Sequence, residues 1–189
     1  MKQAKVLGKS EFARVIAVIE AGSHAARNKV AVHCTHLAGL RVKEVAALTV
    51  GDVYDRNGKV RDSINLSAQQ TKGSNARTVM LCTKLRRILS QYYANLPKIS
   101  ADFPLVYSQK SHKHFSPNSL CQVFARIYAA AGIKGASSHS GRRTFITELA
   151  NKGINAKVLM QLAGHRHLST TQRYIEVNDN MLKAAVELL

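Results

Sequence analysis

Glycines divide most of this chain into short helical patterns. Apolar residues recur every three or four positions in the stretches 10–21, 25–38, 116–131, 139–151 and 155–163. Each stretch ends at or just before a glycine, namely Gly22, Gly39, Gly132, Gly153 and Gly164. Glycine readily adopts the left-handed conformation that closes a helix, and the first, third and fifth stretches begin with the capping residues Ser10, Ser116 and Asn155. The sequence therefore predicts a chain built mainly of short helices.

One region breaks this helical pattern. Between 49 and 81, strand-forming residues alternate loosely, and Asn57-Gly58 is a strong hairpin signal. We expect a strand within 60–66 and a returning strand at 78–81, joined by a turn with Lys72 at its tip. Helical periodicity resumes at 83–95, and the run 105–107 predicts a further short strand. The expected fold class is α+β, mainly helical, with a small antiparallel sheet.

The length of 189 residues suits one domain with a single core. No apolar run approaches the roughly 20 residues that a membrane-spanning helix requires. The basic N-terminus also lacks the apolar stretch of a signal peptide. We therefore expect a cytoplasmic protein without a membrane partner.

The cysteines and histidines give little sign of a metal or disulfide site. Cys34, Cys82 and Cys121 are widely spaced among apolar residues, which predicts reduced cysteines in the core. His33 and His36 can share a helical face, but no second group of ligands follows at a useful spacing. We expect no bound metal.

Positive charge is the strongest bulk property of the chain. It has 28 Lys and Arg against 11 Asp and Glu, a formal net charge of +17 and a pI of about 10.2. Such an excess indicates a polyanionic partner, and we expect nucleic acid. The loop 109–116 carries Lys110 and Lys113, and Arg77 closes the turn that contains Lys72. We therefore expect Arg77, Lys110 and Lys113 to contact DNA phosphates.

Two stretches near the C-terminus combine residues suited to chemistry on a phosphate. One begins with His139 and includes Arg142, and the other runs from Gly164 to Tyr174. A tyrosine hydroxyl, with a pKa of about 10, attacks phosphorus only when neighbours take up its proton and neutralise the phosphate oxygens. His139 and Arg142 are three residues apart and would share one helical face, where arginine can hold two oxygens. Taken alone, Tyr174 would be an ordinary half-buried tyrosine, but its neighbours favour a nucleophile.

A third candidate group follows Gly39. Arg41 and Glu44 are three residues apart at the start of a predicted short helix, so their side chains would lie together. Arg41 can project into a cleft while Glu44 orients it or accepts backbone hydrogen bonds. In isolation such a pair would be an ordinary surface salt bridge.

Together these residues resemble those of the tyrosine recombinase (phage integrase) family in order, context and approximate spacing. The matching positions are Arg41 after Ala-Gly-Leu, Lys72 in the hairpin, His139-x-x-Arg142, Gly164-His165 and Tyr174. The resemblance covers residues 10–180 and implies that 1–189 form the mixed, mainly helical catalytic domain of that family. It also implies a site-specific recombinase that cuts and rejoins double-stranded DNA through a 3′-phosphotyrosyl intermediate, with no ATP, Mg²⁺ or other cofactor.

The resemblance assigns the charged residues to the phosphate and the leaving group. Arg41 and Arg142 match the arginines that hold the non-bridging oxygens, and Glu44 matches the acidic residue that supports the first of them. Lys72 matches the lysine that protonates the leaving 5′-oxygen.

The remaining matched residues are the nucleophile and two histidines that assist the reaction. Tyr174 matches the attacking tyrosine, His139 the histidine of proton transfer, and His165 the histidine that hydrogen-bonds the phosphate. Arg143 departs from the pattern, because many relatives have a histidine there. We expect Arg143 and Arg166 to contact DNA.

The resemblance also bears on partners. Family members usually have a separate N-terminal domain that closes around DNA, whereas about nine residues precede the first predicted helix. We expect either a minimal recombinase or the catalytic half of one, with an absent core-binding domain and weak, salt-sensitive binding as a monomer. The apolar stripe in 178–189 predicts a segment that docks on a neighbouring subunit. We thus expect a homo-oligomer on DNA, with accessory DNA-bending proteins, in a bacterial or phage-encoded protein associated with the nucleoid.

Two alternatives remain at this point. The same chemistry would serve a type IB topoisomerase that nicks and reseals one duplex. A non-catalytic DNA-binding protein that modulates another recombinase is the other alternative, although it would have no need of His139, His165 and Tyr174 together.

Overall fold

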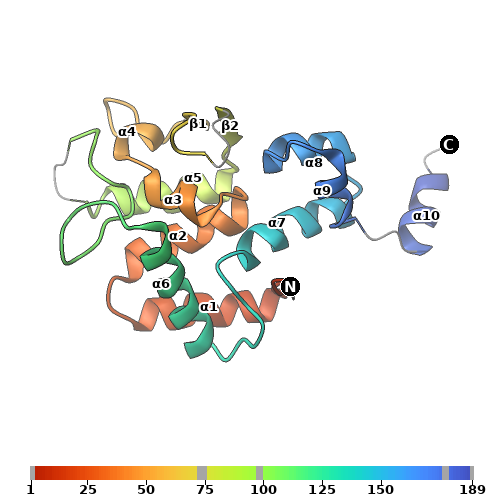
Figure 1. Ribbon diagram of the computed structural model, residues 1–189, viewed down its shortest axis with the longest axis horizontal. Helices are drawn as coiled ribbons and strands as arrows, with labels where there is room; N and C mark the ends of the chain where they lie inside the picture. The colour runs from red at the N-terminus through yellow and green to blue at the C-terminus, as the bar shows by residue number, and fades with distance from the viewer. Residues whose placement is uncertain (1–2, 72–75, 97–99, 176–178, 188–189) are drawn as a thin grey trace.

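The computed structural model describes residues 3–71, 76–96, 100–175 and 179–187, which form short helices and one two-stranded sheet (Figure 1). In chain order the elements are α1 (Lys9–Ala21), α2 (Ala25–Leu37), α3 (Val42–Ala47), α4 (Val50–Val53), β1 (Ser63–Leu66), β2 (Arg77–Met80), α5 (Thr83–Tyr93), α6 (Pro117–Ala130), α7 (Ser140–Asn151), α8 (Ala156–Ala163), α9 (Leu168–Gln172) and α10 (Asp179–Val186). The prediction of a mainly helical α+β fold is confirmed. All five helices predicted to stop at a glycine end within two residues before it.

Helix α2 lies at the centre of the core. It packs against α1, α5 and α7, and every residue from 30 to 35 is buried, as expected for a helix covered on all sides. The approach of α7 is very close, because a Cβ on Gly141 would lie 2.3 Å from Thr35 Oγ1. This contact fixes the first turn of α7, and hence Arg142, against the core.

The small sheet confirms the strands predicted around 60–66 and 78–81. β1 and β2 are antiparallel, and the buried residues Ile64 and Val79 lie opposite each other. The Asn57-Gly58 signal produces a turn, in which Gly58 N donates to Asp55 O at 3.0 Å. Only a single bridge, from Tyr54 to Val60, flanks that turn.

The strand predicted at 105–107 is wrong. Leu105 and Val106 are completely buried, but Leu105 N donates to Leu48 O at 2.8 Å as part of an irregular connection. This apolar run is buried in the core, but it does not pair as a β-strand.

One predicted helix cap is also wrong. Helix α1 begins before Ser10, because Gly8 is the N-cap and its N–H donates to Glu11 Oε2 at 3.0 Å. The helix therefore begins two residues earlier than a cap at Ser10 predicts.

The cysteine prediction holds for one residue and fails for another. Cys34 is buried in α2, Cys121 is half-buried and Cys82 is exposed, and all three are free thiols. Cys82 lies outside the core because it is the N-cap of α5. Across the part of the chain that the structure describes, no helix has the length and apolar character needed to cross a membrane.

Candidate active site

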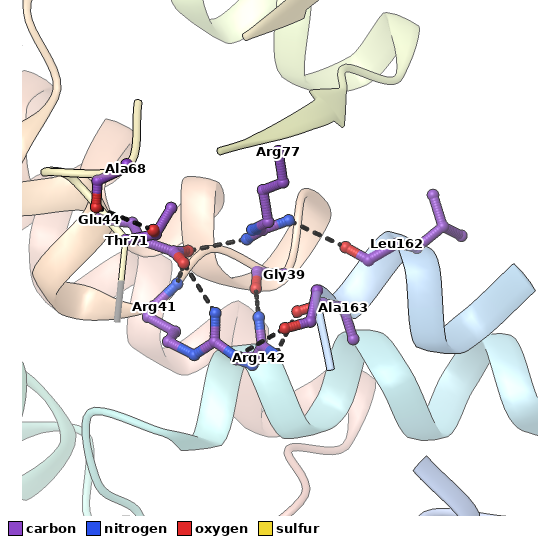
Figure 2. A network of polar contacts seen from close by, with 10 residues as sticks. Gly39, Arg41, Glu44, Ala68, Thr71, Arg77, Arg142, Leu162 and Ala163 are labelled. Atoms are coloured by element: carbon purple, nitrogen blue, oxygen red, sulfur yellow. Dashed lines mark hydrogen bonds and ion pairs between the residues drawn. The ribbon is translucent and has the colours of Figure 1, made fainter. Parts of the chain in front are cut away.

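Three arginines and one glutamate from distant parts of the chain meet in what we call the arginine network, which consists of Arg41, Glu44, Arg77 and Arg142 (Figure 2). Arg41 is the N-cap of α3 and Glu44 lies in its first turn. Arg77 is the first residue of β2, and Arg142 lies in the first turn of α7. The pairing of Arg41 with Glu44 was predicted from their spacing, whereas the presence of Arg77 beside them was not.

Glu44 is the acceptor at the centre of the network. Its side chain is completely buried, Oε1 accepts from Arg41 Nη1 at 2.8 Å, and Oε2 accepts from Arg77 Nη2 at 2.8 Å. Oε2 also accepts from the backbone N–H of Arg41 at 2.8 Å. Burial alone would raise the pKa of Glu44, but the charge and hydrogen bond of Arg77, with those of Arg41, lower it overall. Glu44 is therefore ionised at neutral pH and balances one of the three guanidinium charges.

The same three arginines hold the C-terminal end of α8. Each donates to a different carbonyl: Arg77 Nη1 to Leu162 O at 3.1 Å, Arg142 Nη2 to Ala163 O, and Arg41 Nη2 to Gly164 O at 3.1 Å. The last carbonyls of a helix have no partner within it and carry partial negative charge. The arginines supply the missing donors and so fix the turn that leads to His165.

His165 follows the left-handed Gly164 that ends α8 (φ 62°). Its Nδ1 lies 2.9 Å from the hydroxyl of Thr171, which is completely buried. Burial, together with the charges of Arg142, Arg41 and Arg77, lowers the pKa of His165 to about 4. His165 is therefore a neutral imidazole at pH 7, able to donate one hydrogen bond without adding charge.

Tyr174 lies just beyond α9, where its backbone N donates to Thr171 O at 2.9 Å. Its ring is nearly parallel to that of His165, with 5.9 Å between the centroids and 21° between the planes. The guanidinium carbon of Arg143 lies 5.8 Å from the Tyr174 ring centroid. The Tyr174 ring thus lies near both a neutral imidazole and a cation.

His139, Arg142 and Tyr174 line one cavity of about 720 Å³. His139 is the exposed N-cap of α7, so it does not lie within the helix as its spacing suggested. Burial and the charge of Arg41 lower the pKa of Arg142 to about 9, so Arg142 remains cationic at neutral pH. Lys5 and Lys134 also line this cavity, and Lys5 N donates to Gly135 O at 3.1 Å.

The other candidates are scattered. Lys72 lies outside the described residues. Lys110, Lys113 and Arg166 are exposed, and Lys110 lines a second cavity of about 490 Å³ near the start of α6. Arg77 was predicted to contact DNA, but its side chain is only 11% exposed and its terminal nitrogens are bound to protein acceptors.

Sequence reasoning missed a buried cation in the second cavity. Arg27 is 7% exposed, donates to Tyr107 O at 3.1 Å and lies 5.1 Å from the Phe115 ring. Burial lowers the pKa of Arg27. The sequence offered only a weak signal, an arginine three residues before the core residue Val30 in a predicted helix.

Among the described residues, no group of three or more His, Cys, Asp or Glu is arranged to hold a metal ion. The two histidines of α2 have other contacts. His33 Nδ1 lies 2.8 Å from Lys29 O, and His36 stacks on Phe12 with 3.7 Å between the ring centroids.

Lowering the pH is expected to reduce the free energy of unfolding, with His165 as one cause. The folded protein holds the pKa of His165 and that of His36 at about 4, whereas unfolded histidines titrate at about 6.5. The unfolded state therefore binds more protons between about pH 6.5 and 4, so stability is lost as the pH falls through that window. Urea unfolding between about pH 7 and 4.5 measures this slope.

A His165→Gln variant should show a shallower slope than the native protein, because it lacks one group that must be protonated on unfolding. A native slope in His165→Gln would contradict the low pKa of His165.

The chain is similar to known proteins in both sequence and fold. Residues 5–181 match the family model described as the phage integrase family. Tyrosine recombinase XerA of Pyrococcus furiosus is 29% identical over 186 residues, which cover 97% of this chain and 61% of that protein. The chain spans about half to three fifths of the length of the first curated relatives it matches.

Two solved structures share the fold. A crystal structure of XerA recombinase has a TM-score of 0.74 and 22% identity, covering 100% of this chain and 64% of that one. A pre-cleavage complex of the XerH site-specific recombinase with its difH substrate has a TM-score of 0.72 and 22% identity, covering 98% of this chain and 54% of that one. These similarities confirm the expected catalytic-domain fold.

Proposed function

The chain belongs to the phage integrase family, and from this premise we propose that it is the catalytic domain of a tyrosine site-specific recombinase. In this proposal it cleaves and rejoins double-stranded DNA through a 3′-phosphotyrosyl intermediate. The observation that carries the proposal is the convergence of Arg41, Arg142 and His165 on one site beside Tyr174. The relatives reported above are recombinases, and XerH is bound to a DNA substrate. They give no support to the topoisomerase or non-catalytic alternatives.

The charge of the site suits a phosphodiester. The arginine network contains three guanidinium groups and one carboxylate, so positive charge remains to attract an anion. Arg142 uses one N–H on Gly39 O and one on Ala163 O. A guanidinium has five N–H donors, so three remain on Arg142 for phosphate oxygens. Stabilising the charge that develops on these oxygens is the main task of a phosphoryl-transfer site.

The proposed reaction exchanges one phosphate ester for another. Tyr174 Oη attacks phosphorus, the bond from phosphorus to the 5′-oxygen breaks, and the DNA 3′-phosphate becomes attached to the tyrosine. His139 accepts the tyrosine proton, and Lys72, whose role comes from the resemblance alone, donates a proton to the leaving 5′-oxygen. Attack by the 5′-hydroxyl of a partner strand reverses the step. Because each bond broken is replaced by an equivalent one, the reaction needs no cofactor.

We further propose that the protein acts as a homo-oligomer on DNA. Figure 1 shows α10 apart from the other helices. Two of its apolar side chains, Leu182 and Val186, are 56% and 67% exposed. These residues suit docking on a neighbouring subunit, while Lys110, Lys113, Arg143 and Arg166 are proposed to contact the DNA backbone. Accessory DNA-bending proteins and an association with the nucleoid are further parts of the proposal.

Covalent trapping tests the proposed function. The protein is incubated in EDTA with nicked duplexes that lose a short fragment after cleavage, drawn from a pooled library or from DNA that flanks the encoding gene. We expect a protein–DNA adduct that survives denaturation. DNA binding without any adduct would overturn the proposal. Relaxation of a plasmid without recombinant products would instead indicate a topoisomerase.

A further inference from the structure

Arg77 resembles Arg142 in having both terminal nitrogens bound to protein, but Arg142 lines the cavity of about 720 Å³ and Arg77 is not among the described residues that line it. Figure 2 shows Arg77 between Glu44 on one side and the end of α8 on the other. Nη2 donates to Glu44 Oε2 at 2.8 Å, and Nη1 donates to Leu162 O at 3.1 Å. The side chain is 11% exposed. Both ends of the guanidinium are therefore bound to protein.

The position of Arg77 also depends on Gly164. A Cβ at Gly164 would lie 2.5 Å from Arg77 Cδ, and the φ of Gly164 is +62°. The stem of Arg77 thus lies directly against the residue that turns the chain toward His165. The backbone N–H groups of Gly164 and His165 donate to Gln161 O and Met160 O, each at 3.0 Å. Arg77 is therefore packed against a tightly bonded turn.

We propose that Arg77 is a positioning residue, which locks the turn of Gly164 and His165 onto Glu44 so that His165 faces the phosphate, and which makes no contact with DNA. The inference rests on the proposed function and replaces the expectation that Arg77 binds a DNA phosphate. Glu44 in turn binds Arg41, so one carboxylate sets the relative positions of a phosphate-binding arginine and a phosphate-binding histidine. A lysine cannot replace Arg77, because its single ammonium group lacks the planar fork that reaches two acceptors on opposite sides.

Arg77→Lys separates positioning from DNA contact because it retains the charge. The rate of adduct formation at saturating protein should fall roughly 10- to 100-fold, as expected when a catalytic group is misplaced by a fraction of an ångström or more. The Kd for a nicked duplex, measured in a Tyr174→Phe background, should stay within about twofold, with an unchanged dependence on salt. Arg86→Lys is the matched control, since Arg86 forms an exposed ion pair with Asp62, and it should alter neither quantity.

A DNA contact would produce the opposite result. Binding would weaken, the salt dependence would lose a slope of about one, and the saturating rate would remain native. That combination overturns the inference.

Gly164→Ala provides a second test in which every charge is kept. The new Cβ displaces Arg77, so the saturating rate should fall as in Arg77→Ala. In the double variant, Arg77→Ala removes the atoms that the new Cβ would meet and leaves only the backbone strain of a positive φ, so the combined loss should be smaller than the product of the two single losses. Losses that do multiply would show that the residues act independently and would contradict the inference.

Hydrogen exchange in the absence of DNA separates failure of the inference from failure of the proposed function. In Arg77→Lys, the amides of Gly164 and His165 should exchange at least about tenfold faster, while those of the central helix α2 stay near native. Native exchange at the turn overturns the inference even if the adduct forms. Equal acceleration in α2 would show general destabilisation and overturns it as well. If the native protein forms no adduct, the proposed function fails, and the exchange result still decides whether Arg77 positions the turn.

Discussion

Replacing Tyr174 by phenylalanine is expected to abolish the covalent protein–DNA adduct while leaving DNA binding and stability almost unchanged. The substitution removes only the hydroxyl oxygen that would become bonded to phosphorus. The ring, which lies 5.9 Å from the His165 ring and 5.8 Å from the guanidinium carbon of Arg143, keeps its place. We therefore expect a change of less than about 1 kcal/mol in the free energy of unfolding.

The measurement is denaturing electrophoresis of the trapped reaction, with a filter-binding or fluorescence titration for DNA affinity. Tyr107→Phe is the matched control. Tyr107 is also half-buried, but it packs on Phe103 and His112, away from the cavity that contains Tyr174. The control should form the adduct at the native rate. An adduct that persists in Tyr174→Phe would place the nucleophile on another residue and would remove the basis for the proposed mechanism.

The helices of this protein were predictable because their signals are local. Ser116 accepts a hydrogen bond from Ser119 N at 3.1 Å, and Asn155 accepts one from Lys157 N at 2.8 Å. Each cap acts on residues two or three positions away, so the sequence contains the whole interaction. Ser10 misled because the N–H of Gly8 is satisfied by Glu11. A cap of that kind depends on the glutamate, and a serine at the expected position does not indicate it.

Predictions about which side of an element faces the core were less secure. Cys82 has apolar neighbours in the sequence, yet it is exposed at the start of α5. Leu105 and Val106 are apolar and strand-forming, which predicts a strand. They are instead buried as part of an irregular connection. In both places tertiary packing determines the burial and conformation of the residue, and the neighbouring residues in the sequence do not indicate them.

In the candidate site too, contacts between residues close in sequence were predictable and contacts between distant residues were not. Arg41 and Glu44 were paired correctly because three residues on a helix bring side chains together. Arg77 meets Glu44 from 33 residues away and Leu162 from 85 residues away. No spacing rule connects such positions, so the sequence did not predict that Arg77 lies beside Glu44. Positive charge predicts an anionic partner, but it does not tell which cations face that partner.

Glu44→Gln is expected to destabilise the protein by roughly 3–5 kcal/mol, because it leaves buried arginine charges without their counter-charge. Two carboxylate oxygens now accept three N–H groups, two from Arg41 and one from Arg77. The amide of glutamine keeps one oxygen and replaces the other with an N–H₂ group that can only donate. At least one arginine donor would then face another donor in a site that excludes water. Urea unfolding at neutral pH measures the loss.

Asp62→Asn tests whether this loss of stability arises because the ion pairs of Glu44 are buried, and not from the loss of an ion pair in general. Asp62 also binds an arginine, Arg86, but its side chain is 83% exposed, whereas that of Glu44 is completely buried. Water screens the exposed pair, so the control should change the free energy of unfolding by less than about 1 kcal/mol.

The Glu44→Gln protein should also gain more stability than the native protein from added inorganic phosphate, since an anion that binds the folded state can replace the missing charge. Equal effects of the two substitutions, or no added benefit from phosphate, would contradict the view that Glu44 holds Arg41 and Arg77 in place and offsets the positive charge of the network. If both results agree with the expectation, the carboxylate is what allows a cluster of like charges to remain folded and ready for a phosphate.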